Sequence, residues 1–326
     1  MVFSIAMTHP SANDTAHPHA ELLALDWGTS SLRAVLLDQH GQVLRQHSSA
    51  DGILRIPAQG FAPFFEANFR DWMDRDRFFC LISGMAGSQQ GWAEAPYCPC
   101  PAGFDELADQ LKWIETERIA IVPGMSCLRA GLASSPTLAS IPDVMRGEEV
   151  QVFGALRSLG CNDARMVLPG THSKWVQVRD SRIQHFHTCM TGEMFALLRQ
   201  HSILSRTLPA LDSPADHELD TQAFDEAVAL AVKSPGLLAT AFSTRSLGLW
   251  GTLSPSALLS HLSGLVIGEE LRCQHLTAGE EVIVIGAHAL NLRYGRALES
   301  LGLQPRCLGA EATWAGLFSL YQRFRA

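Results

Sequence analysis

Two short polar segments in this sequence each interrupt an apolar run with glycine and hydroxyl residues. The segment 26–31 reads DWGTSS, and the segment 169–173 reads PGTHS. Such turns have small side chains and exposed backbone N–H groups, so they can wrap a phosphate. Asp26 precedes the first turn at a strand end, where a carboxylate can hold a metal ion directly or through water. Either turn alone could also be an ordinary hairpin whose hydroxyls cap its own backbone.

The two segments align with each other without a gap. Three residues of the first, Gly28, Thr29 and Ser31, fall on Gly170, Thr171 and Ser173 of the second. In both places an apolar strand leads into the polar turn, which we call the elbow (residues 28–30 for the first and 170–172 for the second). A second strand, a turn and a third strand then follow in the same order. Internal similarity of this kind indicates a duplicated fold. We therefore expect two related domains whose elbows hold different phosphates of one nucleotide in a shared cleft.

A third segment near the C-terminus fits the same pattern. The stretch 280–290 reads EEVIVIGAHAL, in which Val282–Ile285 is a buried-strand run that ends at Gly286. A glycine there would let a nucleobase approach the backbone closely. The alternative is a core strand followed by a helix, with no ligand.

Composition limits the classes of protein that are compatible with the sequence. The 326 residues exceed what one core usually serves, which favours two domains. The net charge of −8 without a long basic run argues against a nucleic-acid partner and an anionic membrane surface. No apolar stretch is long enough to span a membrane, and the first residues do not form a secretion signal. The eight scattered cysteines favour reduced thiols in a cytoplasm.

Several longer blocks allow the pattern to be narrowed. They read LDWGTSSLRAVLLD, SGMAGSQQGW, PDVMRGEEVQVFGAL, LPGTHSKWV and LSGLVIGEEL, and with neighbouring blocks they extend from about residue 22 to the end of the chain. The sequence resembles the 2-dehydro-3-deoxygalactonokinase family of the sugar kinase/actin/Hsp70 ATPase superfamily. The resemblance implies ATP- and Mg²⁺-dependent phosphorylation of 2-dehydro-3-deoxy-D-galactonate at its 6-hydroxyl, in galactonate catabolism.

The resemblance also implies an architecture. It is an α/β fold of two duplicated ribonuclease H-like domains with an interdomain cleft. We expect a disordered tail over residues 1–20, an N-terminal α/β domain over 21–140 and a connecting helix over 141–163. The C-terminal α/β domain would then cover 164–326, with the last helix packed back on the first domain.

The same resemblance assigns roles at the nucleotide site. We expect Asp26 to hold Mg²⁺ through water. The residues expected to bind ATP are Gly28, Thr29, Ser30, Gly170, Thr171, Ser173, Lys174 and Gly286. Lys174 could instead reach the substrate carboxylate, or be an exposed lysine at a strand start. The sequence has neither the P-loop pattern GxxxxGK[ST] nor an HRD catalytic loop, so the elbows carry the prediction.

The substrate is an anion with several hydroxyls, and it needs small polar donors, a cation and a base. The expected binding loop is Ser83, Gly84, Met85, Ala86 and Gly87, with Arg146 and Arg33 as candidate partners of the carboxylate. A surface salt bridge is the simpler interpretation of either arginine.

Asp143 is the expected base, placed at the N-terminus of a helix, where a plain N-cap is the alternative. Two other functions stay open: a kinase for another sugar or sugar acid, and a non-catalytic ATP-binding regulator of the same fold. A second copy of the chain is a candidate partner.

Overall fold

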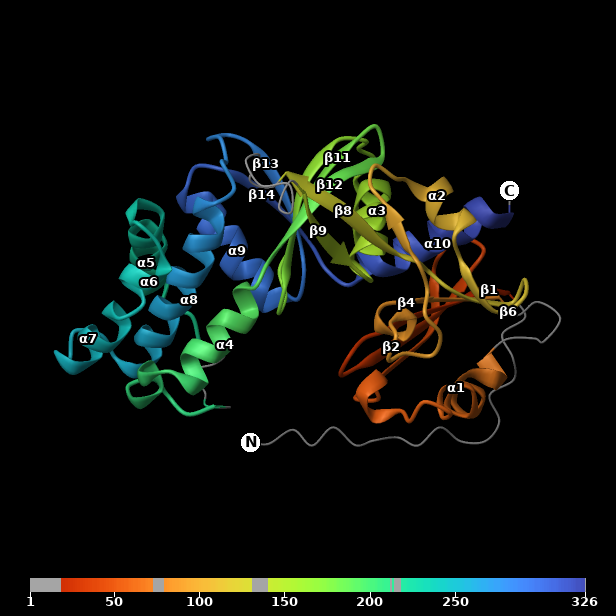
Figure 1. The fold of residues 1–326 in the computed structure, drawn as a ribbon, viewed down its shortest axis with the longest axis horizontal. Helices are drawn as coiled ribbons and strands as arrows, with labels where there is room; N and C mark the ends of the chain where they lie inside the picture. The colour runs from red at the N-terminus through yellow and green to blue at the C-terminus, as the bar shows by residue number, and fades with distance from the viewer. Residues whose placement is uncertain (1–18, 73–78, 131–139, 212, 214–217, 326) are drawn as a thin grey trace. The chain divides into compact units, whose positions relative to one another are not determined.

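The computed structural model describes residues 19–72, 79–130, 140–211, 213 and 218–325, and the chain forms two compact units (Figure 1). Unit 1 consists of Met1–Cys98, Asp105–Gly124 and Leu317–Ala326, and unit 2 consists of Pro99–Phe104 and Met125–Gly316. Residues 1–18 of the expected tail lie outside the described part, and Ala20 already begins the first strand. Among the described helices, none combines the length and the apolar character that crossing a bilayer requires.

Unit 1 is built on a six-stranded sheet with the order β3-β2-β1-β4-β7-β6. Its strands are β1 (Ala20–Trp27), β2 (Leu32–Asp38), β3 (Val43–Ser49), β4 (Cys80–Ser83), β6 (Lys112–Glu115) and β7 (Ile119–Ile121). The first three form an antiparallel meander, and β4 and β7 then run parallel to β1. The parallel pairs bring the carboxyl ends of β1 and β4 to the same edge of the sheet.

Aromatic residues fill the core of unit 1 beneath this sheet. Helix α1 (Phe61–Phe69) buries Phe61, Phe65 and Phe69, which recur every four residues and therefore lie on one face. The ring of Phe61 meets that of Trp27 edge to face at 5.3 Å. The short 3-10 helices η1 (Ile53–Arg55) and η2 (Arg70–Trp72) and the helix α2 (Phe104–Asp109) complete the connections.

The last helix, α10 (Glu311–Arg325), begins in unit 2 and ends in unit 1. In unit 1, the Tyr321 ring packs against Phe79 at 5.3 Å, and the Tyr321 hydroxyl donates to Glu21 Oε2 at 2.7 Å. The C-terminal part of α10 thus belongs to unit 1.

Unit 2 repeats the strand order of unit 1 in a five-stranded sheet, β12-β11-β10-β13-β14. Its strands are β10 (Ala164–Leu168), β11 (Ser173–Arg179), β12 (Arg182–Cys189), β13 (Glu281–Ile285) and β14 (Gln304–Leu308). Again three strands form an antiparallel meander, and two further strands run parallel to the first. The duplication inferred from the two elbows is therefore present in the topology.

Helices gather on one side of the sheet in unit 2 (Figure 1). They are α4 (Thr191–His201), η5 (Ile203–Arg206), α5 (Thr221–Lys233), α6 (Leu237–Thr240), α7 (Ser243–Leu249), α8 (Pro255–Arg272) and α9 (His288–Ser300). Helix α8 packs closely on α5 because Gly264 and Gly268 lack side chains. A Cβ at Gly264 would lie 2.4 Å from Phe224 O, and one at Gly268 would lie 2.8 Å from Ala231 Cβ.

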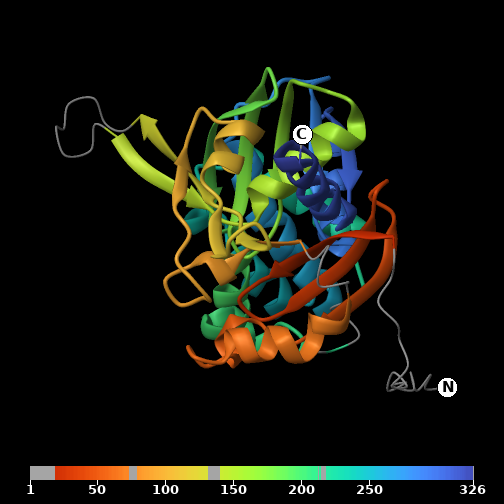
Figure 2. The ribbon, with the colours of Figure 1, turned by 90° about the vertical axis from the view of Figure 1, so that its right-hand side faces the viewer.

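A third, three-stranded sheet was not predicted. It contains β5 (Tyr97–Pro99), β8 (Gly124–Ala130) and β9 (Ser140–Met145) in the order β5-β8-β9. Figure 2 shows β8 and β9, in yellow and yellow-green, as neighbouring antiparallel strands, and Cys127 is the register partner of Asp143.

The segment 141–163 is therefore not one helix, and the prediction that Asp143 stands at a helix N-terminus is wrong. Helix α3 (Glu148–Leu159) begins only after Gly147, whose φ of 107° ends the preceding strand. Pro142 disfavours helical geometry at the residue before it, while an edge strand tolerates its missing N–H. Helix α3 belongs to unit 2, and the chain leaves unit 1 at Gly124 rather than near residue 140.

Candidate active site

The first elbow lies between β1 and β2 in unit 1. Its turn is closed by a hydrogen bond from Gly28 N to Ser31 O at 2.9 Å, and the side chains of Thr29 and Ser30 are exposed. The elbow therefore presents hydroxyl groups and backbone to solvent, as phosphate binding requires.

The segment that follows β3 holds the first elbow from behind. Ile53 N donates to Gly28 O at 3.0 Å, and Leu54 N donates to Thr29 O at 3.3 Å. A Cβ on Gly52 would lie only 2.4 Å from the backbone N of Ser30. Only glycine fits this position without displacing the elbow, and sequence reasoning overlooked it.

Asp26 lies at the end of β1 and forms an ion pair with Arg33, its register partner on β2. The Asp26 side chain is 18% exposed and that of Arg33 is 37% exposed. Arg33 thus forms a salt bridge in the structure, which is the simpler of its two interpretations. The other carboxylate oxygen of Asp26, Oδ1, would lie 3.3 Å from a Cβ on Gly84.

The expected substrate loop follows β4 and packs against the first elbow. Parallel pairing puts Ser83 beside Asp26, and Gly84 has a φ of 92° with its Cβ position 2.9 Å from Trp27 O. Ser83 is fully buried, and its Oγ has no hydrogen-bond partner among the described residues. The structure therefore brings the predicted metal residue, the first elbow and the predicted sugar loop to one edge of one sheet.

Part of that loop is occupied by its own hydrogen bonds. Residues Met85–Gly87 form the 3-10 helix η4, in which Gly87 N donates to Gly84 O and Ser88 N donates to Met85 O. Ala86 and Gly87 are buried. The N–H groups of Gly87 and Ser88 thus donate within the loop, so these two groups are not available to bind a substrate.

The second elbow lies between β10 and β11 in unit 2 and has a matching support. A Cβ on Gly192 would lie 2.4 Å from Gly170 O, so the N-terminus of α4 packs directly on the elbow. Glu193 N donates to Thr171 O at 3.0 Å, and the Glu193 carboxylate pairs with His172 Nε2 at 2.5 Å. Nothing would lie within 4 Å of a Cβ on Gly170, so its backbone is open to a ligand.

Strand β11 leaves the second elbow with alternating side chains on its two faces. Ser173 is fully buried and shares a hydrogen bond with the Tyr294 hydroxyl at 3.0 Å. Lys174 points to the other face, is 6% exposed, and donates to Val144 O at 3.1 Å and Thr188 Oγ1 at 2.8 Å. Lys174 is therefore not an exposed lysine, and the contacts of both side chains do not support their predicted phosphate contacts. Gly170 and Thr171 keep that role as a prediction.

Asp143 lies in the middle of β9 and is held by β12. Thr188 donates its backbone N–H to Asp143 Oδ2 at 2.7 Å and its hydroxyl to Oδ1 at 2.6 Å. The same Thr188 hydroxyl accepts from Lys174, so Lys174, Thr188 and Asp143 form a continuous chain of hydrogen bonds. Arg146 lies beyond the end of β9, is 9% exposed, and its backbone N donates to Glu148 Oε2.

An apolar cavity of about 230 Å³ opens beside the second elbow within unit 2. Residues from the elbow and from α4, α8 and α9 line it, among them Gly170, Thr191, Phe195, Leu259, Leu290 and Tyr294. A cavity with apolar walls and a few polar groups suits the flat ring and ribose of a nucleoside.

Gly286, expected near the adenosine, does not line this cavity. It lines a second one of about 680 Å³, together with residues such as His288 and Asn291 of α9. A Cβ on Gly286 would lie 3.5 Å from Pro169 Cδ, at the start of the second elbow. The structure thus places Gly286 against the elbow, with α9 contributing residues to both cavities.

Comparison with known proteins shows the family and the fold of the chain. The 2-keto-3-deoxy-galactonokinase family model matches residues 26–320. The chain belongs to this family. It is 36% identical to a probable 2-dehydro-3-deoxygalactonokinase of Rhizobium meliloti (strain 1021), over 90% of this chain and 94% of the relative. It is 31% identical to the 2-dehydro-3-deoxygalactonokinase of Escherichia coli (strain K12), over 92% and 97% of the two chains.

Solved structures support the same fold. A crystal structure of a 2-dehydro-3-deoxygalactonokinase-type protein from Sinorhizobium meliloti matches with a TM-score of 0.79 and 33% identity, over 93% of this chain and 98% of that one. The activator of the 2-hydroxyisocaproyl-CoA dehydratase from Clostridium difficile, with bound ADPNP, matches with a TM-score of 0.50 and 10% identity, over 93% and 95%. The first likeness supports the kinase family, and the second shows the fold.

Among the described residues, one buried carboxylate that the sequence analysis did not single out accepts hydrogen bonds from three side chains. Glu270, near the end of α8, is 4% exposed and accepts hydrogen bonds from Trp175, Thr191 and Tyr294. Its burial raises the pKa of the carboxyl group, and burial also raises the pKa of the Tyr294 hydroxyl. The signal available in the sequence was the pair of charged residues, Glu269 and Glu270, that follows the largely apolar stretch LSGLVIG.

Proposed function

We propose that the protein transfers the γ-phosphate of ATP to the 6-hydroxyl of 2-dehydro-3-deoxy-D-galactonate, which yields the 6-phosphate and ADP. The observation that carries this proposal is the repeated elbow. Both elbows lie at the first corner of the same β-meander, one in each unit, and each is packed on a glycine of another segment. Family membership supplies the substrate class.

The nucleotide contacts follow from the exposed atoms of the elbows. We assign Thr29 and Ser30 of the first elbow, and Gly170 and Thr171 of the second, to the phosphates of ATP. The adjoining apolar cavity would receive the adenosine. Hydrogen bonds from hydroxyls and backbone N–H groups to an anion are stronger than those to neutral acceptors.

Asp26 fits a magnesium ion that is held mainly by the nucleotide. Mg²⁺ usually keeps several waters and binds through one or two carboxylates together with substrate phosphates. In the described part of the chain, no group of three or more His, Cys, Asp or Glu side chains could hold a metal ion. A single carboxylate beside a phosphate-binding elbow agrees with this mode. When bound, the ion supplies positive charge to the transferring phosphate.

The sugar acid would bind at the loop Ser83–Gly87, with Arg146 as the candidate partner of its carboxylate. The buried Ser83 hydroxyl, which lacks a protein partner among the described residues, offers a hydrogen bond to a substrate hydroxyl. Asp143 would accept the proton of the 6-hydroxyl as that oxygen attacks the phosphate. Its fixed carboxylate, held by Thr188, suits this role. The scattered cysteines favour a cytoplasmic location.

The test is coupled ADP release with Mg-ATP and 2-dehydro-3-deoxy-D-galactonate, beside the gluconate-derived epimer and other sugar acids. We expect turnover on the galactonate-derived acid and its loss in Asp143→Asn. Turnover of only another sugar or sugar acid would show that this other compound is the substrate. ATP binding without turnover on any acid would instead support a regulator. Full activity of Asp143→Asn would agree with the kinase activity but would show that Asp143 is not the base.

A further inference from the structure

Three groups that surround the second elbow converge on one buried carboxylate. Glu270 Oε1 accepts from Trp175 Nε1 at 2.6 Å, and Glu270 Oε2 accepts from the Tyr294 hydroxyl at 2.7 Å and from the Thr191 hydroxyl. All of these residues are at least nine-tenths buried. One side chain on α8 thereby joins β11, α4 and α9.

The network extends to the second elbow itself. Since the Tyr294 hydroxyl donates its one proton to Glu270, the Ser173 hydroxyl must donate to the Tyr294 oxygen, 3.0 Å away. Ser173 directly follows the elbow residues Gly170–His172. The rotamer of Ser173 is therefore set by Glu270 through Tyr294.

The network also forms part of the wall of the apolar cavity. Thr191 and Tyr294 line that cavity together with Gly170. Gly192, which follows Thr191, packs on the elbow backbone. The same carboxylate thus holds two residues of the cavity wall and one residue of the elbow strand.

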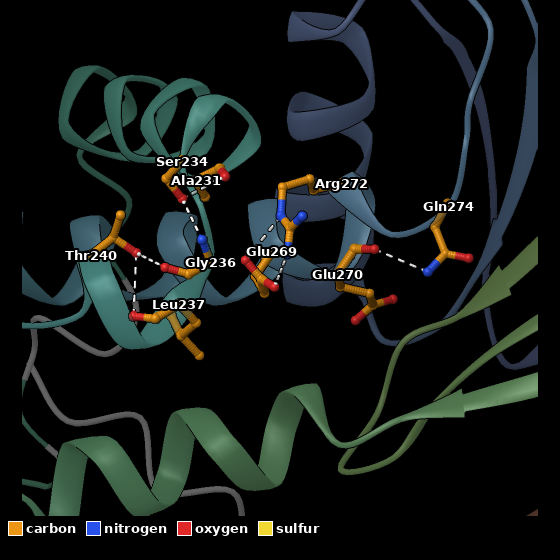
Figure 3. A network of polar contacts seen from close by, with 9 residues as sticks. All are labelled: Ala231, Ser234, Gly236, Leu237, Thr240, Glu269, Glu270, Arg272 and Gln274. Carbon is orange, nitrogen blue, oxygen red and sulfur yellow. Dashed lines mark hydrogen bonds and ion pairs between the residues drawn. The ribbon is translucent and has the colours of Figure 1, made fainter. Parts of the chain in front are cut away.

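The neighbouring Glu269 has a different environment. It forms an ion pair with Arg272 at 2.5 Å on the same helix, with a side chain that is 23% exposed. Figure 3 shows the Glu270 side chain pointing away from Arg272. Gln274 Nε2 donates to the backbone oxygen of Glu270, and the donor–acceptor distance is 2.9 Å. The two adjacent glutamates are a matched pair, because only one of them reaches the cavity wall.

We propose that Glu270 is a positioning residue for ATP, which fixes the second elbow and the nucleoside cavity in one arrangement through Thr191, Tyr294 and Ser173. The inference rests on the proposed function, because it requires ATP to bind at this elbow. Glu270 itself touches no ligand. Its contribution is preorganisation, since the donors would otherwise be free to adopt several rotamers before ATP binds.

The test compares variants of the full chain by calorimetry with a non-hydrolysable ATP analogue and Mg²⁺, and by steady-state kinetics. Glu270→Leu removes every acceptor, so we expect the dissociation constant of the analogue and the KM for ATP to rise about tenfold or more. The KM for the sugar acid should stay within about twofold of the wild-type value. Glu269→Leu, the matched control, should leave both unchanged.

Two further variants separate positioning from folding. Glu270→Gln keeps the side-chain length and can accept from Trp175, while the hydroxyls of Thr191 and Tyr294 turn to accept from its amide, so ATP binding should be largely rescued. Tyr294→Phe keeps the carboxylate and the ring but breaks the link to Ser173. It should weaken ATP binding by about three- to tenfold, even if Glu270→Leu does not fold.

The outcomes distinguish the two proposals. One outcome is that the wild type binds the analogue and that Tyr294→Phe and folded Glu270→Leu bind it with the same affinity. That result would overturn the positioning role of Glu270 but would leave the proposed kinase activity intact. An equal rise in both KM values, or no rescue by glutamine, would overturn it as well, because a purely structural role has that signature. A wild type that binds no analogue would overturn both.

Discussion

Thr188 holds both carboxylate oxygens of Asp143, with its backbone N–H on Oδ2 at 2.7 Å and its hydroxyl on Oδ1 at 2.6 Å. The register of β11 and β12 places Lys174 opposite Thr188, and the lysine donates to the same hydroxyl. A residue that takes a proton from a substrate hydroxyl must keep a fixed orientation, and this pair of hydrogen bonds provides it.

The hydroxyl of Thr188 should therefore matter for turnover. Thr188→Val keeps the shape and the backbone bond but removes the bond to Oδ1, so we expect kcat to fall about ten- to a hundredfold with little change in the KM for ATP. Thr188→Ser retains the hydroxyl and should stay within about threefold of the wild type. Steady-state kinetics on both variants checks this, and equal activity of the two would show that the contact does not position a base.

Gly52 should be intolerant of a side chain. Because a Cβ there would meet the backbone N of Ser30 at 2.4 Å, Gly52→Ala must displace the first elbow. We expect ATP affinity to fall about tenfold or more, measured by calorimetry. The equivalent variant Gly192→Ala should act in the same way on the second elbow, where its Cβ would meet Gly170 O at 2.4 Å.

A control for these variants lies inside helix α9. A Cβ at Gly295 would meet only Cys307 Sγ, at an ordinary 3.6 Å. Gly295→Ala should leave ATP affinity unchanged and raise the free energy of unfolding by about 0.5–1 kcal/mol. If Gly52→Ala bound ATP as tightly as Gly295→Ala, the close packing behind the first elbow would have no part in nucleotide binding.

Asp26 and Arg33 allow the metal role to be separated from the ion pair. If Asp26 holds the magnesium of Mg-ATP, Asp26→Asn should raise the Mg²⁺ concentration needed for half-maximal activity by about tenfold. Arg33→Gln breaks the same ion pair but keeps the carboxylate, so its Mg²⁺ requirement should stay near the wild-type value. A Mg²⁺ titration at saturating ATP measures both, and equal shifts would assign Asp26 to the ion pair alone.

The sequence predicted more of the fold than of the side-chain contacts. The aligned elbows were enough to predict two related domains, because each strand–elbow–strand unit is formed by consecutive residues and can therefore be recognised in the sequence. The strands β8 and β9 were missed, since β9 contains Pro142, a residue that argues against a strand assignment. Asp143 was consequently assigned to a helix.

The roles of Ser173 and Lys174 show where sequence reasoning ends. Both are polar residues beside a turn that is predicted to bind phosphate, which made them ligand candidates. Their burial depends on α9 and β9, which are distant in the sequence, and no local pattern reports it. The same holds for Glu270, whose donors come from three separate elements.

Glu149 should make the stability of the protein depend on pH. It is fully buried in the first turn of α3 and accepts from Gly147 N at 2.7 Å and 2.9 Å, and burial raises its pKa to about 8. In the unfolded chain the carboxyl group ionises near its usual pKa of 4.5, whereas in the folded state it keeps its proton to a higher pH. The unfolded state therefore binds fewer protons between these values, and stability falls as pH rises through that window.

Glu149→Gln should remove this contribution, because the amide keeps the acceptor for Gly147 and cannot ionise. Relative to the variant, the wild type should lose up to about 1.4 kcal/mol of unfolding free energy per pH unit between pH 5 and pH 8. Thermal unfolding of both proteins at pH 5, 6.5 and 8 measures the difference in Tm, which should widen steadily in favour of the variant. Parallel Tm curves would mean that Glu149 is already ionised in the folded protein at pH 5.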